Sequence, residues 1–207
     1  ERSRILIIDD EEIVRHSCIQ ILAKSNYEIA TAENGTQGLE LLEEFQPDLV
    51  LVDLKMPGIS GFDVLDRIHA YDMTIVTIVI TGFATVDSAV EAMKKGTYDF
   101  LPKPFTRDEL RMLIRRGLEQ RKLVLETINL RKEKELLREH FAAIVSHELK
   151  SPLGAVQQNL FVLASDLADK LTGEQKTKLE RLQTRIRDMV TMIYIWLRVI
   201  SVDISKI

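Results

Sequence analysis

Residues 49–53 read Leu-Val-Leu-Val-Asp, an unbroken apolar run that ends in a carboxylate. A strand that is apolar on both faces suits a parallel sheet covered by helices on both sides. Amphipathic stretches separate this run from four others of the same kind. The other runs are Arg4–Ile8, Tyr27–Thr31, Ile75–Thr81 and Tyr98–Leu101. This alternation predicts an α/β fold with a doubly wound parallel sheet in the first half of the chain.

Polar side chains stand where each predicted strand ends. They are Asp9 and Asp10 after the first run, Asp53 after the third, Thr81 in the fourth and Lys103 after the fifth. The carboxyl ends of parallel strands meet at one edge of a sheet, where ligands bind. Clustered carboxylates repel one another unless a cation is bound, and hard oxygen ligands favour Mg²⁺. A metal-bound aspartate beside a lysine and a hydroxyl can accept a phosphoryl group, because these groups neutralise and bind the transferring oxygens.

One aspartate after a strand could merely begin a helix, where the helix dipole favours a carboxylate, but all five positions together favour the phosphoryl site. The segments around them resemble response-regulator receiver domains over roughly residues 3–120. The matching segments are Ile7-Ile8-Asp9-Asp10-Glu11, Val52-Asp53-Leu54-Lys55-Met56-Pro57-Gly58, Ile80-Thr81-Gly82 and Leu101-Pro102-Lys103-Pro104-Phe105. The resemblance implies a flavodoxin-like (βα)5 fold, and we assign residues 1–120 to this domain.

The resemblance also implies the metal site. Asp53 would be the phosphoacceptor. Asp10, Asp53 and the backbone carbonyl of Lys55 would bind Mg²⁺ directly, and Asp9 would act through water.

A conformational switch is the other implication of the resemblance. Thr81 and Lys103 would bond the phosphoryl oxygens, and Phe100 would repack as Thr81 moves. Phe100 could also be an ordinary core aromatic. The peptide bond before Pro104 would be cis, which X-Pro bonds adopt at low cost.

A long helical connector is predicted after the receiver. Residues 107–147 contain no proline and only one glycine, Gly117, and are rich in Leu, Glu, Lys and Arg. Thr106 followed by Glu109 is a capping box that starts the helix. Apolar residues follow an approximate heptad seam that fades through Arg131–Glu135, so we expect a coiled coil over residues 107–140. The alternative is a single exposed helix with no partner.

Two apolar series at helical spacing then predict a helical hairpin. The first series is Phe141, Val145, Leu149, Leu153, Val156, Leu160, Leu163 and Leu167. The second is Leu179, Leu182, Ile186, Met189, Ile193, Leu197 and Ile200. A second capping box, Thr172 with Gln175, marks the turn between them. Two helices bury little surface, so we expect residues 135–207 to form a homodimeric four-helix bundle.

His147 lies midway between two seam positions, about 200° around the helix from the seam, so its ring is expected to face away from it. Residues 146–153 read Ser-His-Glu-Leu-Lys-Ser-Pro-Leu and resemble the phosphoacceptor box of sensor histidine kinases. The resemblance implies that His147 is phosphorylated with help from Glu148. Ser151 stands where that family often has Thr or Asn, which puts phosphatase activity in doubt. Pro152 cannot donate to the Glu148 carbonyl, so a bend is expected after the histidine.

Composition excludes several classes of protein. The chain has 207 residues and a net charge of −4, divided into −9 over residues 1–105 and +5 over residues 106–207. Its hydrophobic content of 45% excludes disorder by composition, and its one cysteine, Cys18, excludes an internal disulfide. No apolar run is long enough to span a membrane, which leads us to expect a cytoplasmic protein. The chain begins at Glu1 rather than Met, so we expect a fragment or a processed chain.

These features predict the receiver and dimerisation modules of a hybrid histidine kinase. Few glycines follow Gly117, so no glycine-rich nucleotide loop is present, and the ATP-binding domain of the parent protein is expected to be missing. An unbroken helix would place His147 roughly 60 Å from the receiver site at ~1.5 Å per residue, which favours regulation of the kinase by Asp53. The alternative is transfer from His147 to Asp53 of another molecule, and either scheme needs a partner kinase or response regulator. A DNA-binding regulator or a purely structural dimeriser is disfavoured, so no nucleic-acid partner is expected.

Overall fold

The computed structural model describes residues 2–167 and 170–202, without the side chains of residues 142, 146, 147, 150 and 197–202. The chain divides into two compact units, Glu1–Thr127 and Ile128–Ile207. The strands are β1 (Ser3–Ile8), β2 (Tyr27–Ala32), β3 (Leu49–Val52), β4 (Val76–Thr81) and β5 (Asp99–Pro102). The helices are α1 (Glu12–Leu22), α2 (Gly35–Phe45), α3 (Gly61–Tyr71), α4 (Val86–Lys94), α5 (Arg107–Asp166) and α6 (Gly173–Val202).

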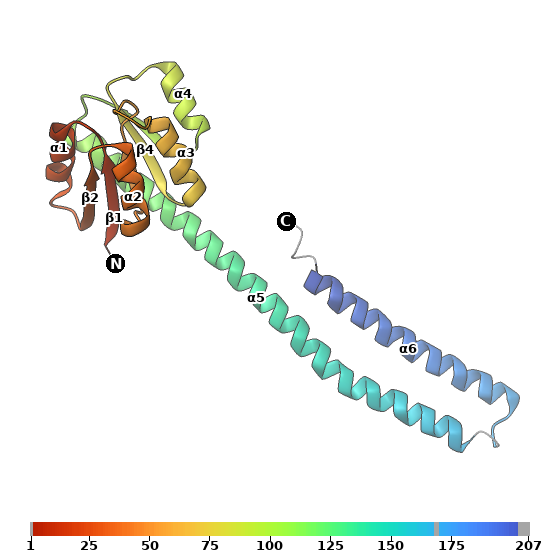
Figure 1. Ribbon diagram of the computed structural model, residues 1–207. Helices are drawn as coiled ribbons and strands as arrows, with labels where there is room; N and C mark the ends of the chain where they lie inside the picture. Colours follow the sequence, from red (N-terminus) through yellow and green to blue (C-terminus); the bar gives the residue numbers. More distant parts are fainter. Residues whose placement is uncertain (1, 168–169, 203–207) are drawn as a thin grey trace. The chain divides into compact units, whose positions relative to one another are not determined.

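The first unit is the predicted doubly wound sheet. Its five parallel strands lie in the order β2-β1-β3-β4-β5, with Ile7 level with Leu51 and Val52 level with Val79. The order reverses at β1, which creates the switch point where such sheets bind ligands. Figure 1 shows the strands β1, β2 and β4 among the helices of this unit.

Helices cover both faces of the sheet, and successive strand residues supply opposite cores. Leu49 and Leu51 of β3 pack with α1 and the start of α5, where Cys18 and Ile114 are buried. Val50 and Val52 pack with α2, α3 and α4. A strand that is buried on both faces must be apolar throughout, which explains the unbroken Leu-Val-Leu-Val run.

Helix α5 begins at the predicted capping box. The Thr106 hydroxyl accepts from the Glu109 N–H (3.3 Å), and the Glu109 carboxylate accepts from the Thr106 N–H (2.7 Å) and hydroxyl (2.8 Å). These hydrogen bonds lower the pKa of Glu109 below its usual value. The helix continues through Pro152, which is tolerated at the cost of one backbone hydrogen bond.

The second unit is the predicted helical hairpin. The end of α5 and helix α6 flank a turn in which Thr172 and Gln175 form the expected reciprocal cap. Gln183 of α6 donates to the Leu160 carbonyl of α5 at 3.4 Å. Figure 1 shows the two helices of the hairpin running in opposite directions. Within the described residues, no helix is long and apolar enough to cross a membrane.

Candidate functional site

Three carboxylates meet at the carboxyl edge of the sheet. Asp9 follows β1 and Asp53 follows β3, and each aspartate is almost fully buried, whereas Asp10 is exposed. One carboxylate oxygen from each residue lies within 4.8 Å of the other two. Burial raises the pKa of Asp9 above its usual value, and Lys103 partly opposes that shift. Oxygen ligands at this spacing can hold a divalent cation, so the cluster is consistent with a metal site.

Lys103 balances the charge of this cluster. Its ammonium lies 2.8 Å from Asp53 Oδ2, 2.8 Å from Asp9 Oδ2 and 2.9 Å from Glu11 Oε1. Burial lowers the pKa of Lys103, but its bonds to the three carboxylates outweigh burial and raise the pKa above the usual value. The sequence predicted the meeting of Lys103 with Asp9 and Asp53. Sequence reasoning assigned no role to Glu11, because only the folded structure shows that its side chain reaches Lys103.

The loops that follow the neighbouring strands β3 and β4 are joined by a side-chain contact. The Lys55 N–H donates to Asp53 Oδ1 at 3.2 Å, and the Phe83 N–H donates to the hydroxyl of the buried Thr81 at 3.2 Å. The ammonium of Lys55 lies 3.0 Å from the centroid of the Phe83 ring, a cation–π contact that links the two loops. Sequence reasoning missed this contact because it joins side chains that follow different strands.

The backbone around Asp53 is fixed by close packing. Gly61 begins α3 directly against Asp53, and a methyl group there would overlap the Asp53 carbonyl oxygen and Leu54 Cα. Arg15 donates to the backbone carbonyls of Asp9 at 2.7 Å and Asp10 at 3.0 Å. These contacts hold the aspartates in place without using their carboxylates.

The residues predicted to form a switch lie beside the site. Phe100 of β5 is half-buried against the core formed with α2, α3 and α4. The Lys103–Pro104 peptide bond is cis, as the resemblance implied.

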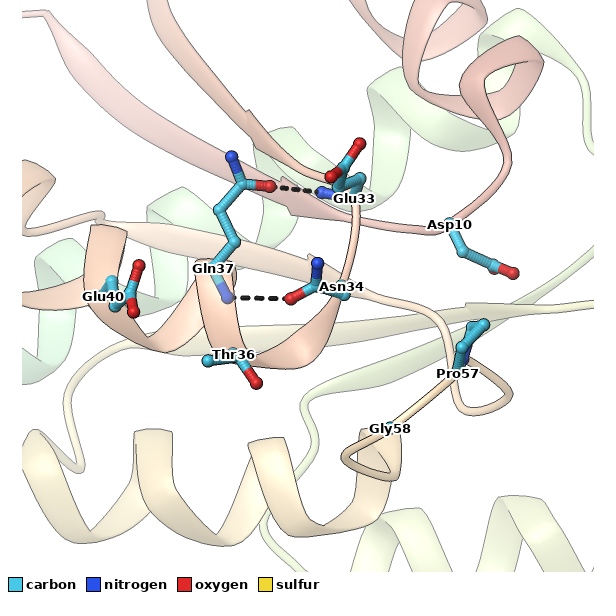
Figure 2. Close-up of a pocket in the computed structure, with 8 residues that line it drawn as sticks. All are labelled: Asp10, Glu33, Asn34, Thr36, Gln37, Glu40, Pro57 and Gly58. Carbon is cyan, nitrogen blue, oxygen red and sulfur yellow. Dashed lines mark hydrogen bonds between the residues drawn. The ribbon is translucent and has the colours of Figure 1, made fainter.

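A shallow polar pocket opens beside Asp10. Figure 2 shows the Glu33 N–H donating to the Gln37 side chain (2.8 Å) and the Gln37 N–H donating to the Asn34 side chain (2.9 Å). Glu40 and Pro57 also line this pocket. The exposed carboxylate of the cluster is therefore accessible from this side.

The second predicted phosphoacceptor lies in the hairpin unit. The backbone of His147 is helical within α5, but its side chain lies outside the described residues. Glu148, Ser151 and Pro152 follow in the same helix, with Ser151 exposed. His147 and Ser151 therefore lie about one turn apart on the same helix.

The predicted seam of the hairpin is only partly covered by the hairpin itself. Several seam residues, among them Leu153, Leu160 and Ile186, are partly buried, whereas five others are about half exposed. The exposed seam residues are Phe141 (61%), Val156 (45%), Leu163 (51%), Leu182 (50%) and Met189 (49%).

Comparison with known proteins assigns both units. The family model of the response regulator receiver domain matches residues 5–115, and that of the His Kinase A (phospho-acceptor) domain matches residues 137–198. The chain is 37% identical over 117 residues to the regulatory protein AtoC of Escherichia coli (strain K12), covering 56% of this chain and 25% of AtoC. It is 34% identical over 115 residues to the sporulation initiation phosphotransferase F of Bacillus subtilis (strain 168), covering 56% of this chain and 93% of that protein.

A solved structure agrees with the fold of the first unit. NtrX from Brucella abortus superposes with a TM-score of 0.60 at 33% identity, covering 64% of this chain and 30% of NtrX. The chain spans about a quarter of the length of AtoC, so the likeness concerns only the receiver part of that regulator. The chain belongs to the response regulator receiver domain family and carries a His Kinase A phosphoacceptor domain after its receiver.

Proposed function

We propose that Asp53 is the phosphoacceptor of a Mg²⁺-dependent receiver that regulates a histidine kinase module. The observation that carries this proposal is the meeting of three carboxylates with the Lys103 ammonium. An oxygen of Asp53 would attack the phosphorus of the donor, and the bond from phosphorus to the leaving group would break. The products are an acyl phosphate on Asp53 and the free leaving group.

The residues around Asp53 fit this chemistry. Asp10, Asp53 and the Lys55 carbonyl would hold Mg²⁺, with Asp9 acting through water. When bound, the metal would neutralise the charge on the transferring oxygens. Lys103 lies 2.8 Å from Asp53 and would bond a phosphoryl oxygen there, and Thr81 would bond another. Phe100 and the cis-bonded Pro104 would form the switch that responds to Thr81.

His147 is proposed as the phosphoacceptor of the second unit. It lies in the part of the chain that matches the phosphoacceptor family model, within the Ser146–Leu153 box. Its ring nitrogen would attack the γ-phosphorus of ATP, the bond from that phosphorus to the bridging oxygen would break, and ADP would leave. Glu148 would assist by accepting the ring proton or by orienting the ring. The ATP-binding domain would come from outside residues 1–207. Ser151 keeps a hydroxyl but not the shape of Thr or Asn, so phosphatase activity is not part of the proposal.

The module is proposed to act as a homodimer. Domains of the phosphoacceptor family typically dimerise. The half-exposed seam residues of one hairpin, such as Leu163 and Leu182, would be covered by a second hairpin in a four-helix bundle. In this proposal the receiver takes residues 1–120 and the dimerisation and phosphotransfer domain takes residues 135–207. The coiled-coil connector between them takes residues 107–140.

The direction of signalling proposed is from Asp53 to His147. Helix α5 starts in the receiver unit and includes His147, so one helix leads from the unit that holds Asp53 to the second phosphoacceptor. A change in receiver packing could therefore alter the helix that carries the histidine. The alternative is phosphotransfer from His147 to Asp53 of another molecule, which the likeness to a relative named a phosphotransferase favours.

Phosphorylation of the full-length parent protein from radiolabelled ATP tests the proposal. His147→Gln should abolish labelling, and Asp53→Asn should leave label on His147 but change its amount. Label that persists in His147→Gln contradicts the assignment of the histidine. Mixing the phosphorylated hairpin with the isolated receiver identifies the alternative, because label would then pass to Asp53.

A further inference from the structure

A cluster of charged residues holds α5 at the edge of the sheet opposite Asp53. The Arg121 guanidinium donates to the Pro47 carbonyl at 3.3 Å, forms an ion pair with Asp48, and lies 3.8 Å from Asp72 Oδ2. The Arg121 side chain is only 13% exposed. We name Arg121, Asp48 and Asp72 the clasp.

The clasp joins α5 to the amino ends of three strands. The second oxygen of Asp48 accepts from the Arg4 N–H at 2.7 Å, at the start of β1. The Asp48 carbonyl accepts from the Val76 N–H at 3.2 Å, at the start of β4. Asp72 follows α3, and its other oxygen accepts from the Thr74 N–H at 2.7 Å in the turn into β4. Strands β3 and β4 therefore carry the clasp at one end and Asp53 and Thr81 at the other.

Arg121 lies about one turn beyond Gly117, the last buried residue among the described residues of α5, and Val124, one turn further on, is only partly buried. Leu110, Ile114 and Gly117 are buried against the sheet, whereas Leu123 (59%) and Leu130 (59%) are exposed. Among the described residues, Arg121 Nε is buried without a partner, which costs free energy. An apolar residue at position 121 would continue the buried face of the helix without that cost. The charge therefore points to a geometric role, because a forked guanidinium fixes the rotation of the helix more sharply than an apolar contact does.

We infer that the clasp is the coupling point that passes the state of the receiver into the connector. Arg121 is a positioning residue, and it fixes the rotation of α5 relative to β3 and β4 about one turn beyond the close approach of Gly117 to these strands. Changes at Asp53 and Thr81 reach the connector through these two strands. The inference rests on the proposed regulation of His147 by Asp53 and names the residues that carry it.

The test compares the rate of His147 phosphorylation from ATP in the full-length parent protein before and after Asp53 is charged with acetyl phosphate. In the wild type the two rates should differ. In Arg121→Ala the difference should disappear, although Asp53 is phosphorylated to the wild-type extent. Arg121→Lys should restore part of the difference, because it keeps the charge but not the forked geometry.

Two controls separate coupling from stability. Arg115→Ala removes an arginine of the same helix whose side chain is 71% exposed, and should behave as wild type. Leu22→Val weakens the core from α1 and should keep the rate difference. If Arg121→Ala fails to fold, Asp72→Asn is measured instead, because it removes the charge facing Arg121 and keeps the oxygen that accepts from Thr74.

The outcomes distinguish this inference from the proposed function. A full rate difference in a folded Arg121→Ala or Asp72→Asn protein overturns the inference and leaves the proposed regulation standing. Loss of the rate difference in Leu22→Val also overturns the inference. It would show that any destabilisation of the receiver removes the difference, whether or not the clasp is intact. Equal rates in the wild type overturn the proposed regulation itself, and the inference falls with it.

Discussion

Lys103 is the residue on which the charge balance of the receiver site depends. Asp9 and Asp53 are almost fully buried, and two buried carboxylates repel one another unless a cation lies between them. The Lys103 ammonium lies 2.8 Å from each of them. Asp10 adds a third carboxylate that is exposed and accessible from outside, so one positive charge faces three acidic groups and Glu11.

This charge excess predicts that Mg²⁺ stabilises the protein. A ligand that binds only the folded state adds about 2.7 kcal/mol at a concentration of 100 times its dissociation constant. Thermal unfolding should therefore shift to higher temperature with Mg²⁺, and Asp10→Asn should remove most of the shift. Glu33→Gln is the matched control, because Glu33 lines the pocket beside Asp10 but is not in the carboxylate cluster. An equal shift in Asp10→Asn would exclude Asp10 as a ligand.

Cys18 gives a second prediction at this scale. It is fully buried in the core between α1 and the sheet, and burial raises its pKa to about 12. The thiolate is the reactive form, so the native thiol should not react with iodoacetamide at pH 8. Mass spectrometry should find modification only after denaturation. Rapid modification of the native protein would contradict the buried position of the thiol.

At the scale of elements, the packing of α5 on the sheet depends on Gly117. Glycine in a helix costs about 1 kcal/mol relative to alanine, so this residue needs a structural reason. A methyl group there would lie 2.9 Å from Val76 Cγ1 and 3.0 Å from Leu49 Cδ1, closer than ordinary contact. The glycine therefore lets the helix approach β3 and β4 closely, about one turn before Arg121.

Gly117→Val should destabilise the receiver by about 1–3 kcal/mol, the usual cost of overpacking a core. Urea unfolding followed by circular dichroism measures the change. The matched control is Glu119→Val on the same helix. The Glu119 side chain is 68% exposed, so a valine there does not overpack the core. Equal losses in the two variants would show that helix propensity, not packing, sets the effect.

Local patterns predicted most elements well. Leu49–Val52 has the predicted limits because aspartates flank its apolar run on both sides, and the other four strands differ by a residue at one or both ends. The caps at Thr106 and Thr172 were also predicted, because each depends on residues three positions apart. The roles of Glu11, Phe83 and Arg121 were not predicted, since each contacts a residue far away in the chain. Their positions depend on the tertiary fold rather than on any local pattern.

At the scale of the whole molecule, the hairpin unit gives a prediction about assembly. Leu182 lies on the seam and is 50% exposed. Leu182→Glu should raise the dimer dissociation constant at least about tenfold, because each buried leucine adds about 1.5–3 kcal/mol and 1.4 kcal/mol is tenfold. Analytical ultracentrifugation measures it. Thr184→Glu is the control, because two residues turn the helix by about 200° and place the new charge away from the seam.

Loss of dimer in both variants would show that added charge alone prevents association. An unchanged dimer in Leu182→Glu would show that the seam is not the interface.

The role proposed for the receiver depends on Asp53 being a metal-dependent phosphoacceptor. Incubation of the chain with acetyl phosphate and Mg²⁺, followed by intact mass and peptide mapping, tests this directly. We expect one phosphoryl group on the peptide that contains Asp53, with none in Asp53→Asn and none when the metal is chelated. Phosphorylation at another residue, or at Asp53 without any divalent metal, would contradict the account.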